Sequence, residues 1–578
     1  MSPRPCAASL VLSCFLLPAA GAQEKADEPT FYESIDVQVV NLEVFVTDKD
    51  GKRVTGLTRD DFQLREDGKP VEISNFFAVG DAPVAAAASD TPPALSGNAP
   101  VPAPAAPPEE QRLHLAILVD NLSLLPDGRN RLLKSLRDEV IPRLRADDLA
   151  LVATYQGSTV EWAQGLTADK PALLASLGAV AQGAPRGVER EMERHRLLQQ
   201  IDQADLVAGP RPDLAEEIAK EVYQEIRTYT QRRYTETRGT LGAIDGFIDT
   251  LAGLPGRKAL LYVGGGLSLH PGESFYRAWQ KKFAALSLKV GASELDAFDQ
   301  DTTSLFERMI EHANGNRVTF YTLAAAQELS GLSAETGGSA TWTSDLETAE
   351  FVNLTESLHR LADGTGGLAS VNANDPRRIL ARLCDDFGSY YSLGFVPQGR
   401  KDAKNRKLEV AVRGRRDLLV RHRTGRRERP LQERMTDRTL AALLLDPGQN
   451  PLEVALDVGR ETKNDKGQIL VEVLVKFPIA RLVLLPQGNA HEGRVSVWVS
   501  ARDQHGRSSP VQEIAIPIRV PNDQLLTALG QTAAYKMPLL LRPEEHRIAV
   551  AMRDELGNVD SAVTASFKPG QAAATPKP

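Results

Sequence analysis

Hydrophobic positions in the middle of the chain form both unbroken runs and helical repeats. The run Leu115–Val119 contains only apolar residues and ends at Asp120. Because it lacks the alternation of a half-buried strand, it predicts a strand buried on both faces of a parallel sheet. Downstream, apolar residues recur at helical spacing over residues 132–144, and Asp127 stands where a helix cap is expected. The pattern predicts a strand, a loop and a helix, with Asp120 at the carboxyl edge of the sheet.

Segments of strand and helix character alternate over residues 111–398, which predicts a doubly wound α/β domain with a parallel sheet. The strands expected after the first are "DLALVATYQ", "TVEWAQ", "RKALLYVGGG", "RVTFYTLA", "GGLASV" and "YYSLGFVP". The helical insertion at residues 187–253 is charged and amphipathic, with Ile218, Val222 and Ile226 on one face. We favour a helix that faces the core over a coiled coil that binds a partner.

In the regions on either side of this domain, hydrophobic and polar residues instead alternate with a period of two. Residues 31–79 do so around Asp-Gly turns, which predicts an N-terminal all-β module. Residues 399–434 alternate arginines with aliphatic residues, which predicts a basic β-hairpin extension with a solvated charged face; a patch for anionic lipid or glycan is the alternative. Residues 435–568 alternate again and predict a C-terminal β-sandwich.

Three further segments are not expected to join a core. Residues 1–22 combine an early arginine, a short apolar stretch and a small-residue site before Gln23, which predicts a cleaved secretory signal peptide. Residues 80–110 are rich in proline and alanine and predict a semi-extended linker, and residues 569–578 predict a disordered tail. We expect no membrane span, because the apolar stretch falls short of the roughly 20 residues that a spanning helix needs.

Composition narrows the classes of function. The 578 residues are too many for one ordinary core, and 42% hydrophobic with 25% charged residues is typical of globular domains. A net charge of −8 argues against nucleic acid as a partner. The sequence contains no HExxH, GxSxG or GxxxxGK[ST] motif, and its nine histidines lack metal-ligand spacing. We therefore do not expect an enzyme.

Several blocks of the sequence together carry a family resemblance. They read "VNLEVFVTDKDGKRVTGLTRDDFQLREDGKPVEISNF", "LAILVDN", "LPGRKALLYVGGGL", "LADGTGGLASVNANDPRRIL", "DFGSYYSLGFVP" and "RKLEVAVRGRRDLLVRHRTG". In this order they resemble the exported von Willebrand factor A-related family first defined in acidobacteria. The resemblance spans about residues 35–425 and leaves the last domain outside. It implies a von Willebrand A fold used for binding rather than catalysis.

Domains of that fold often hold a divalent cation through an Asp-x-Ser-x-Ser motif, a threonine from a loop and an aspartate after the fourth strand. The resemblance places Asp120 at the first aspartate and Thr240 at the threonine. Leu122 and Leu124 stand at the serine positions, and Gly265 stands where the second aspartate is expected. Mg²⁺ prefers a full shell of oxygen ligands. The sequence therefore predicts a degenerate site with no resident cofactor, where Mg²⁺ or Mn²⁺ would bind weakly at best.

Asp120 has a structural alternative. Its carboxylate could accept hydrogen bonds from the amides of its own turn or of the glycine loop 264–266. The same rim could then bind a peptide without metal, through Asn121, Ser123 and Asp127, with the glycines allowing close approach to the backbone.

These features predict an exported, non-enzymatic binding or scaffold protein, periplasmic or secreted. Its von Willebrand A-like domain would contact a protein partner in the envelope or the extracellular space. Two alternatives remain open. One is a divalent-cation-dependent adhesin whose partner supplies the missing acid, and the other is an envelope hydrolase with an unrecognised site.

Overall fold

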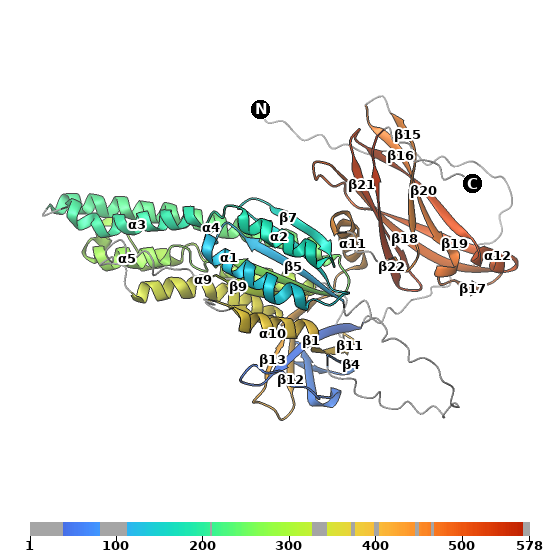
Figure 1. Ribbon diagram of the computed structural model, residues 1–578, viewed down its shortest axis with the longest axis horizontal. Coiled ribbons are helices and arrows are strands. Elements are labelled where there is room, and N and C mark those ends of the chain that lie inside the picture. The colour runs from blue at the N-terminus through green and yellow to red at the C-terminus, as the bar shows by residue number, and fades with distance from the viewer. Residues whose placement is uncertain are drawn as a thin grey trace. The chain divides into compact units, whose positions relative to one another are not determined.

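The computed structural model describes residues 39–80, 112–208, 211–325, 344–371, 376–397, 404–445, 450–463 and 467–569. The predicted signal peptide lies outside these residues, as do all but the edge residues of the predicted linker and tail. The described chain combines helices with several β-sheets, in a multidomain arrangement of one α/β region and additional β regions (Figure 1). None of its described helices is long and apolar enough to cross a membrane.

A six-stranded sheet forms the centre of the α/β region. Its spatial order is β10-β9-β8-β5-β6-β7. The strands are β5 (Leu113–Asp120), β6 (Leu149–Tyr155), β7 (Val160–Thr167), β8 (Arg257–Gly264), β9 (Val318–Ala324) and β10 (Ala369–Ser370). All neighbours are parallel except β6 and β7, so the sheet is mixed at one edge. Every residue of β5 is buried, which confirms the strand predicted from the unbroken apolar run.

Helices cover both faces of this sheet. One face packs against α1 (Pro126–Ser135), α2 (Lys170–Gln182) and α10 (Arg377–Gly388). The other packs against the second half of α4 (Pro212–Ala252), α7 (Thr303–Gly315) and α9 (Ser344–Thr365). Along β5, Leu115 and Ile117 face the first layer, and Ala116 and Leu118 face the second. This alternation explains why the run Leu115–Val119 contains no polar residue before Asp120.

A helical extension grows out of the α/β region. It consists of α3 (Gly187–Ala208), the first half of α4, α5 (Glu273–Phe283) and the short turns α6 (Ser287–Val290) and Glu294–Phe298 (Figure 1). These helices share an aromatic core around Tyr223, Phe275 and Trp279 that contains no described strand residue. Val222 and Ile226 lie in this core, so the interpretation of residues 187–253 as core-facing helix is confirmed.

Strands from distant parts of the chain build the N-terminal β region. One sheet has the order β13-β1-β11-β4, and the other has the order β14-β12-β2-β3. The first contains β13 (Leu419–His422), β1 (Val40–Thr47), β11 (Tyr390–Phe395) and β4 (Ile73–Val79), and the second contains β14 (Gly425–Arg427), β12 (Asn405–Val412), β2 (Phe62–Glu66) and β3 (Lys69–Val71). The two sheets share one hydrophobic core. The described part of the predicted N-terminal module, residues 39–79, is therefore only one part of a composite β region.

This pairing corrects two predictions. The segment "YYSLGFVP" forms β11, which pairs with β1 and β4 and does not belong to the central sheet. The basic segment 399–434 is not a simple hairpin, because β12 pairs with β2 and β14 whereas β13 pairs with β1. Its charged face is also partly internal, since Arg426 is buried and forms a 2.5 Å ion pair with Glu66. Local alternation does not reveal which distant strand a segment will join.

Arg257 connects the composite β region to the central sheet. It is the first residue of β8 and is buried. Its guanidinium forms a 2.9 Å ion pair with Glu43 of β1 and lies 3.9 Å from the ring centroid of Tyr390. It also donates hydrogen bonds to the carbonyl oxygens of Asp386 and Phe387 at the end of α10. This one side chain therefore contacts both β1 and β11.

The C-terminal region consists of a helix followed by two packed sheets. The helix α11 (Leu431–Leu445) occupies the start of the segment for which only β structure was predicted. One sheet contains β15 (Ala455–Lys463), β16 (Ile469–Pro478) and β20 (Thr532–Leu541), and the other contains β17 (Leu485–Gln487), β18 (Ala490–Asp503), β19 (Gln512–Pro521), β21 (His546–Asp554) and β22 (Val559–Phe567). Their facing residues share one core, as in a sandwich. On the outer side, Met435 and Leu443 of α11 pack against Trp498.

The composite β region predicts unequal costs for two leucine truncations. Leu393 of β11 is fully buried between the two sheets, whereas Leu419 of β13 is 52% exposed. We expect Leu393→Ala to lower the free energy of unfolding by about 2–5 kcal/mol, because it leaves a cavity, and the control Leu419→Ala by about 0.5 kcal/mol or less. Denaturant unfolding of both variants measures this difference. Equal costs would contradict the placement of β11 in this core.

Candidate functional site

The carboxylate of Asp120 is held by three hydrogen-bond donors at the carboxyl end of β5. Its Oδ1 accepts a hydrogen bond from the backbone N–H of Leu122 at 3.0 Å. Its Oδ2 accepts from the Ser123 hydroxyl at 2.6 Å and from the Tyr262 hydroxyl of β8 at 2.7 Å. Asp120 is only 1% exposed. Burial and the neighbouring carboxylate raise the pKa of Tyr262 well above its usual value, so the phenol keeps the proton that it donates.

Ser123 extends this network to the glycine loop. While its hydroxyl donates to Asp120, it accepts a hydrogen bond from the backbone N–H of Gly265 at 2.9 Å. A Cβ on Gly265 would lie 2.2 Å from the Ser123 carbonyl oxygen, so a side chain cannot be placed here without moving the backbone. The structure thus brings Asp120, Ser123 and Gly265 together. The glycine loop reaches Asp120 through the serine hydroxyl.

Asn121 faces away from this network. Its side-chain oxygen accepts a hydrogen bond from Arg129 of α1 at 3.2 Å, and its backbone N–H donates to the Tyr155 carbonyl oxygen of β6 at 2.9 Å. Arg129 is itself buried and also donates to the carbonyl oxygen of Ala181 at 2.8 Å. Asn121 and Arg129 therefore tie the loop after β5 to α1 and α2.

The other two predicted residues lie apart from Asp120. Thr240 is buried in α4, donates to the Glu236 carbonyl oxygen at 3.0 Å and hydrogen-bonds the Tyr155 hydroxyl. Asp127 is exposed in the first turn of α1, but Leu125 occupies the N-cap position and Pro126 follows it. The prediction that Asp127 caps this helix is therefore wrong. Its negative charge still lies favourably near the positive end of the helix dipole.

The helical extension begins directly on this rim. The backbone N–H of Arg186 donates to the Asn121 carbonyl oxygen at 2.7 Å, and that of Gly187 donates to the Leu124 carbonyl oxygen at 3.2 Å. Val188 and Met192 follow one helical turn apart on α3, and both are exposed. Residues one turn apart share a helix face. An apolar face of α3 therefore stands next to the rim, whose polar side chains are mostly buried.

The residues around Asp120 do not suit a divalent cation. Mg²⁺ requires several oxygen ligands in a nearly ideal octahedron. Here the carboxylate already accepts hydrogen bonds from Leu122, Ser123 and Tyr262. Within the described ranges, no group of three or more His, Cys, Asp or Glu side chains is arranged to hold a metal ion. We therefore derive no function from a metal at this rim.

Sequence reasoning missed two residues that hold the loop after β5, namely Tyr262, which donates to Asp120, and Arg129, which donates to Asn121. Tyr262 is the single polar side chain in the run "ALLYVGGG", three residues before Gly265. A hydroxyl in a doubly buried strand needs a hydrogen-bond partner, and this signal was present in the sequence. Arg129 carried a weaker signal, because one arginine on a polar helix is usually solvated.

Comparison with known proteins adds little to this geometry. No protein-family model matches the chain, and no curated protein matches it. Among solved structures, it is similar to one described as the X-ray structure of Northeast Structural Genomics Consortium target SoR45, with 12% sequence identity and a TM-score of 0.16. That similarity covers 22% of this chain and 95% of the other. It carries no functional argument.

The hydrogen bonds around Asp120 predict a cost for removing the tyrosine hydroxyl. Tyr262→Phe takes one donor from a buried carboxylate, and we expect the free energy of unfolding to fall by about 1–3 kcal/mol. Tyr535→Phe in β20 is the control, because Tyr535 is only partly buried. Denaturant unfolding of the two variants tests this. A neutral Tyr262→Phe would show that the hydroxyl does not stabilise Asp120.

The same network predicts the response to cations. We expect the melting temperature of the chain to stay unchanged in chelator and after addition of Mg²⁺ or Mn²⁺, because the Asp120 carboxylate is already occupied by three hydrogen-bond donors. A bound cation would instead raise the melting temperature by mass action. Asp120→Ala should lower the melting temperature equally with and without cation, since it leaves buried donors unpaired. Thermal unfolding with metal analysis checks both. A cation-dependent rise that Asp120→Ala removes would restore the adhesin hypothesis.

Proposed function

We propose that this chain is an exported, non-enzymatic binding protein that contacts a protein partner through a von Willebrand A-like domain. The doubly wound central sheet is compatible with the fold that the sequence blocks imply. Ligands of such sheets bind at the carboxyl ends of the strands. This edge holds the loop after β5 and the start of α3.

The observation that carries the proposal is the helical extension rooted on that edge. Five of the six rim residues expected from sequence, namely all except Asp127, are buried. A partner would therefore contact what the rim supports, which is Asp127 and the exposed face of α3 with Val188 and Met192. The closed network around Asp120 would hold this surface in place without itself touching the partner.

Exposed apolar side chains on a helix suit recognition of a folded protein. Met192 is 68% exposed, and methionine adapts to irregular partner surfaces. Apolar anchors at the centre of an interface usually carry most of the binding energy. We therefore assign Met192 the role of anchor and Asp127 a role at the rim of the contact.

Photo-crosslinking in the cells that produce the protein tests this surface. A photoreactive amino acid at position 127 or 192 should yield the same protein adduct. Position 526 is the control, because Leu526 is an 87% exposed apolar residue in the C-terminal region. With the partner identified, Met192→Glu should weaken its affinity about tenfold or more, which corresponds to about 1.4 kcal/mol. Adducts shared equally by all three positions, or none at 127 and 192, would refute the proposal.

A further inference from the structure

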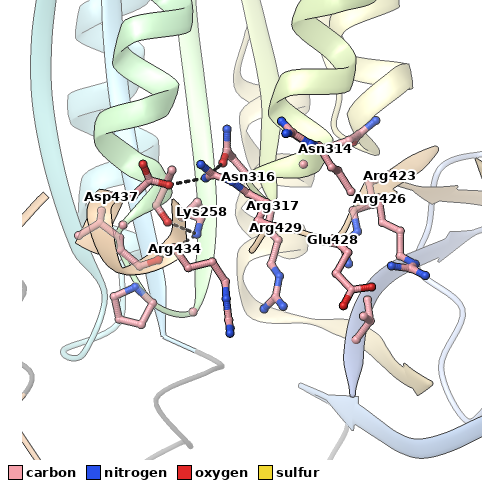
Figure 2. A pocket seen from close by; sticks show the side chains of 18 of the residues that line it. Lys258, Asn314, Asn316, Arg317, Arg423, Arg426, Glu428, Arg429, Arg434 and Asp437 are labelled. Carbon is pink, nitrogen blue, oxygen red and sulfur yellow. Dashed lines mark hydrogen bonds and ion pairs between the residues drawn. The ribbon is translucent and has the colours of Figure 1, made fainter. Parts of the chain in front are cut away.

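A basic cavity of about 210 Å³ lies at the opposite, amino-terminal edge of the central sheet. Lys258, the second residue of β8, and Arg317, which directly precedes β9, contribute from the sheet. The remaining walls come from the loop after α4, from residues 423–429 and from α11. Figure 2 shows basic side chains from these segments around one opening. The cavity is thus built by parts of the chain that are distant in sequence.

Positive charge dominates the lining. The basic residues are Lys258, Arg317, Arg423, Arg426, Arg427, Arg429, Arg434 and Arg438, and the acidic ones are Glu428 and Asp437. Part of this charge is neutralised in the fold. Arg426 pairs with Glu66, Arg429 pairs with Asp437 and Glu433, and Arg438 pairs with Asp560 at 2.7 Å.

Lys258 and Arg423 differ from these paired arginines. The Lys258 ammonium is buried and donates hydrogen bonds to the carbonyl oxygens of Leu254 at 2.9 Å and Ala252 at 3.4 Å. Arg423 donates to the Asn41 carbonyl oxygen at 2.8 Å, while its Nε is buried with no hydrogen-bond partner in the described part of the chain. Neither forms an ion pair with a described carboxylate. Buried cations are normally paired, yet the partners of the buried Lys258 ammonium are carbonyl oxygens, and Arg423 beside it is only partly exposed.

Burial and mutual repulsion lower the pKa of both groups. Burial, followed by the charges of Arg317, Arg423 and Arg429, lowers the pKa of Lys258 to about 7, and Asp437 opposes this only in part. Burial and the charge of Arg317 likewise lower the pKa of Arg423 to about 9, and Glu43 opposes this only in part. The protonated cluster therefore destabilises the empty fold, and an anion would relieve that cost.

We propose that this cavity binds a phosphate-type oxyanion, with Lys258 and Arg423 as its primary ligands. Guanidinium groups bind phosphate oxygens through paired N–H donors, and a lysine ammonium adds a point charge. The volume is below the roughly 300–1,000 Å³ of pockets for drug-sized ligands, so the ligand is a free oxyanion or a small phosphate ester. This site is separate from the proposed protein-binding surface, which lies at the other edge of the sheet.

Thermal unfolding of the full mature chain tests the proposal. The probes are phosphate, sulfate and glycerol phosphate, each compared with chloride at matched ionic strength. We expect oxyanions, but not chloride, to raise the melting temperature by mass action. A response to glycerol phosphate identifies an ester as the ligand, whereas a response limited to phosphate and sulfate identifies the free ion. Equal shifts with all salts, including chloride, would refute the site.

Variants assign the effect to the cavity. Lys258→Met keeps the length of the buried side chain, so the variant should melt in chloride at the wild-type temperature or above, yet bind sulfate about tenfold or more weakly. Lys134→Met is the matched control, because Lys134 is 77% exposed on α1, and it should respond as the wild type does. Arg423→Gln supplies an independent second variant. Unchanged sulfate affinity in both Lys258→Met and Arg423→Gln would overturn the assignment.

The pH dependence distinguishes Lys258 from general electrostatic attraction. Sulfate keeps both charges between pH 6 and 7.5, so any change reports on the protein. As pH rises through about 7, Lys258 loses its proton, whereas Arg423, whose pKa is about 9, keeps its proton over this range and Asp437 stays paired with Arg429. Sulfate affinity of the wild type should therefore fall over this range, and that of Lys258→Met should stay flat. A flat wild-type profile would remove Lys258 from the site.

Discussion

The arrangement of the central and N-terminal regions depends on the interactions of the buried Arg257 guanidinium. It pairs with Glu43 of β1, stacks on Tyr390 of β11 and donates to backbone oxygens at the end of α10. A buried charge is tolerated only when it is paired and hydrogen-bonded. Both β1 and β11 must therefore be in place before β8 can bury its first residue favourably.

The two edges of the central sheet differ in how their charged side chains are paired. At the carboxyl edge, Asp120 is fully provided with donors from Leu122, Ser123 and Tyr262, and the network is closed. At the amino edge, the buried Lys258 and the partly exposed Arg423 line one cavity, and neither forms an ion pair with a described carboxylate. A closed network rigidifies a rim and supports a surface beside it. An excess of buried positive charge is instead compatible with a site that gains stability when an anion enters.

Because of this contrast, the polar residues that stand out in the sequence are not the best candidates for binding a ligand. Asp120 is prominent because it interrupts an apolar run, and its role in the fold is to accept hydrogen bonds from its own loop and from β8. The arginines of residues 399–434 read as a solvated face, yet Arg426 is buried against Glu66 and Arg423 lines a cavity. Burial, which only the tertiary structure sets, decides how each charge behaves.

Local patterns in the sequence were sufficient for the elements whose environment is uniform. The apolar run of β5 predicted burial on both faces, and the amphipathic repeat near Val222 predicted a core-facing helix, because each pattern reports directly on what its element packs against. Strand pairing was decided only by the tertiary structure. β11 joins β1 from more than 300 residues away, and this pairing depends on side chains that meet only in the folded chain. The hydrogen-bond partner of the Tyr262 phenol and the cavity around Lys258 follow from the same long-range contacts, so neither could be located before the strands were placed.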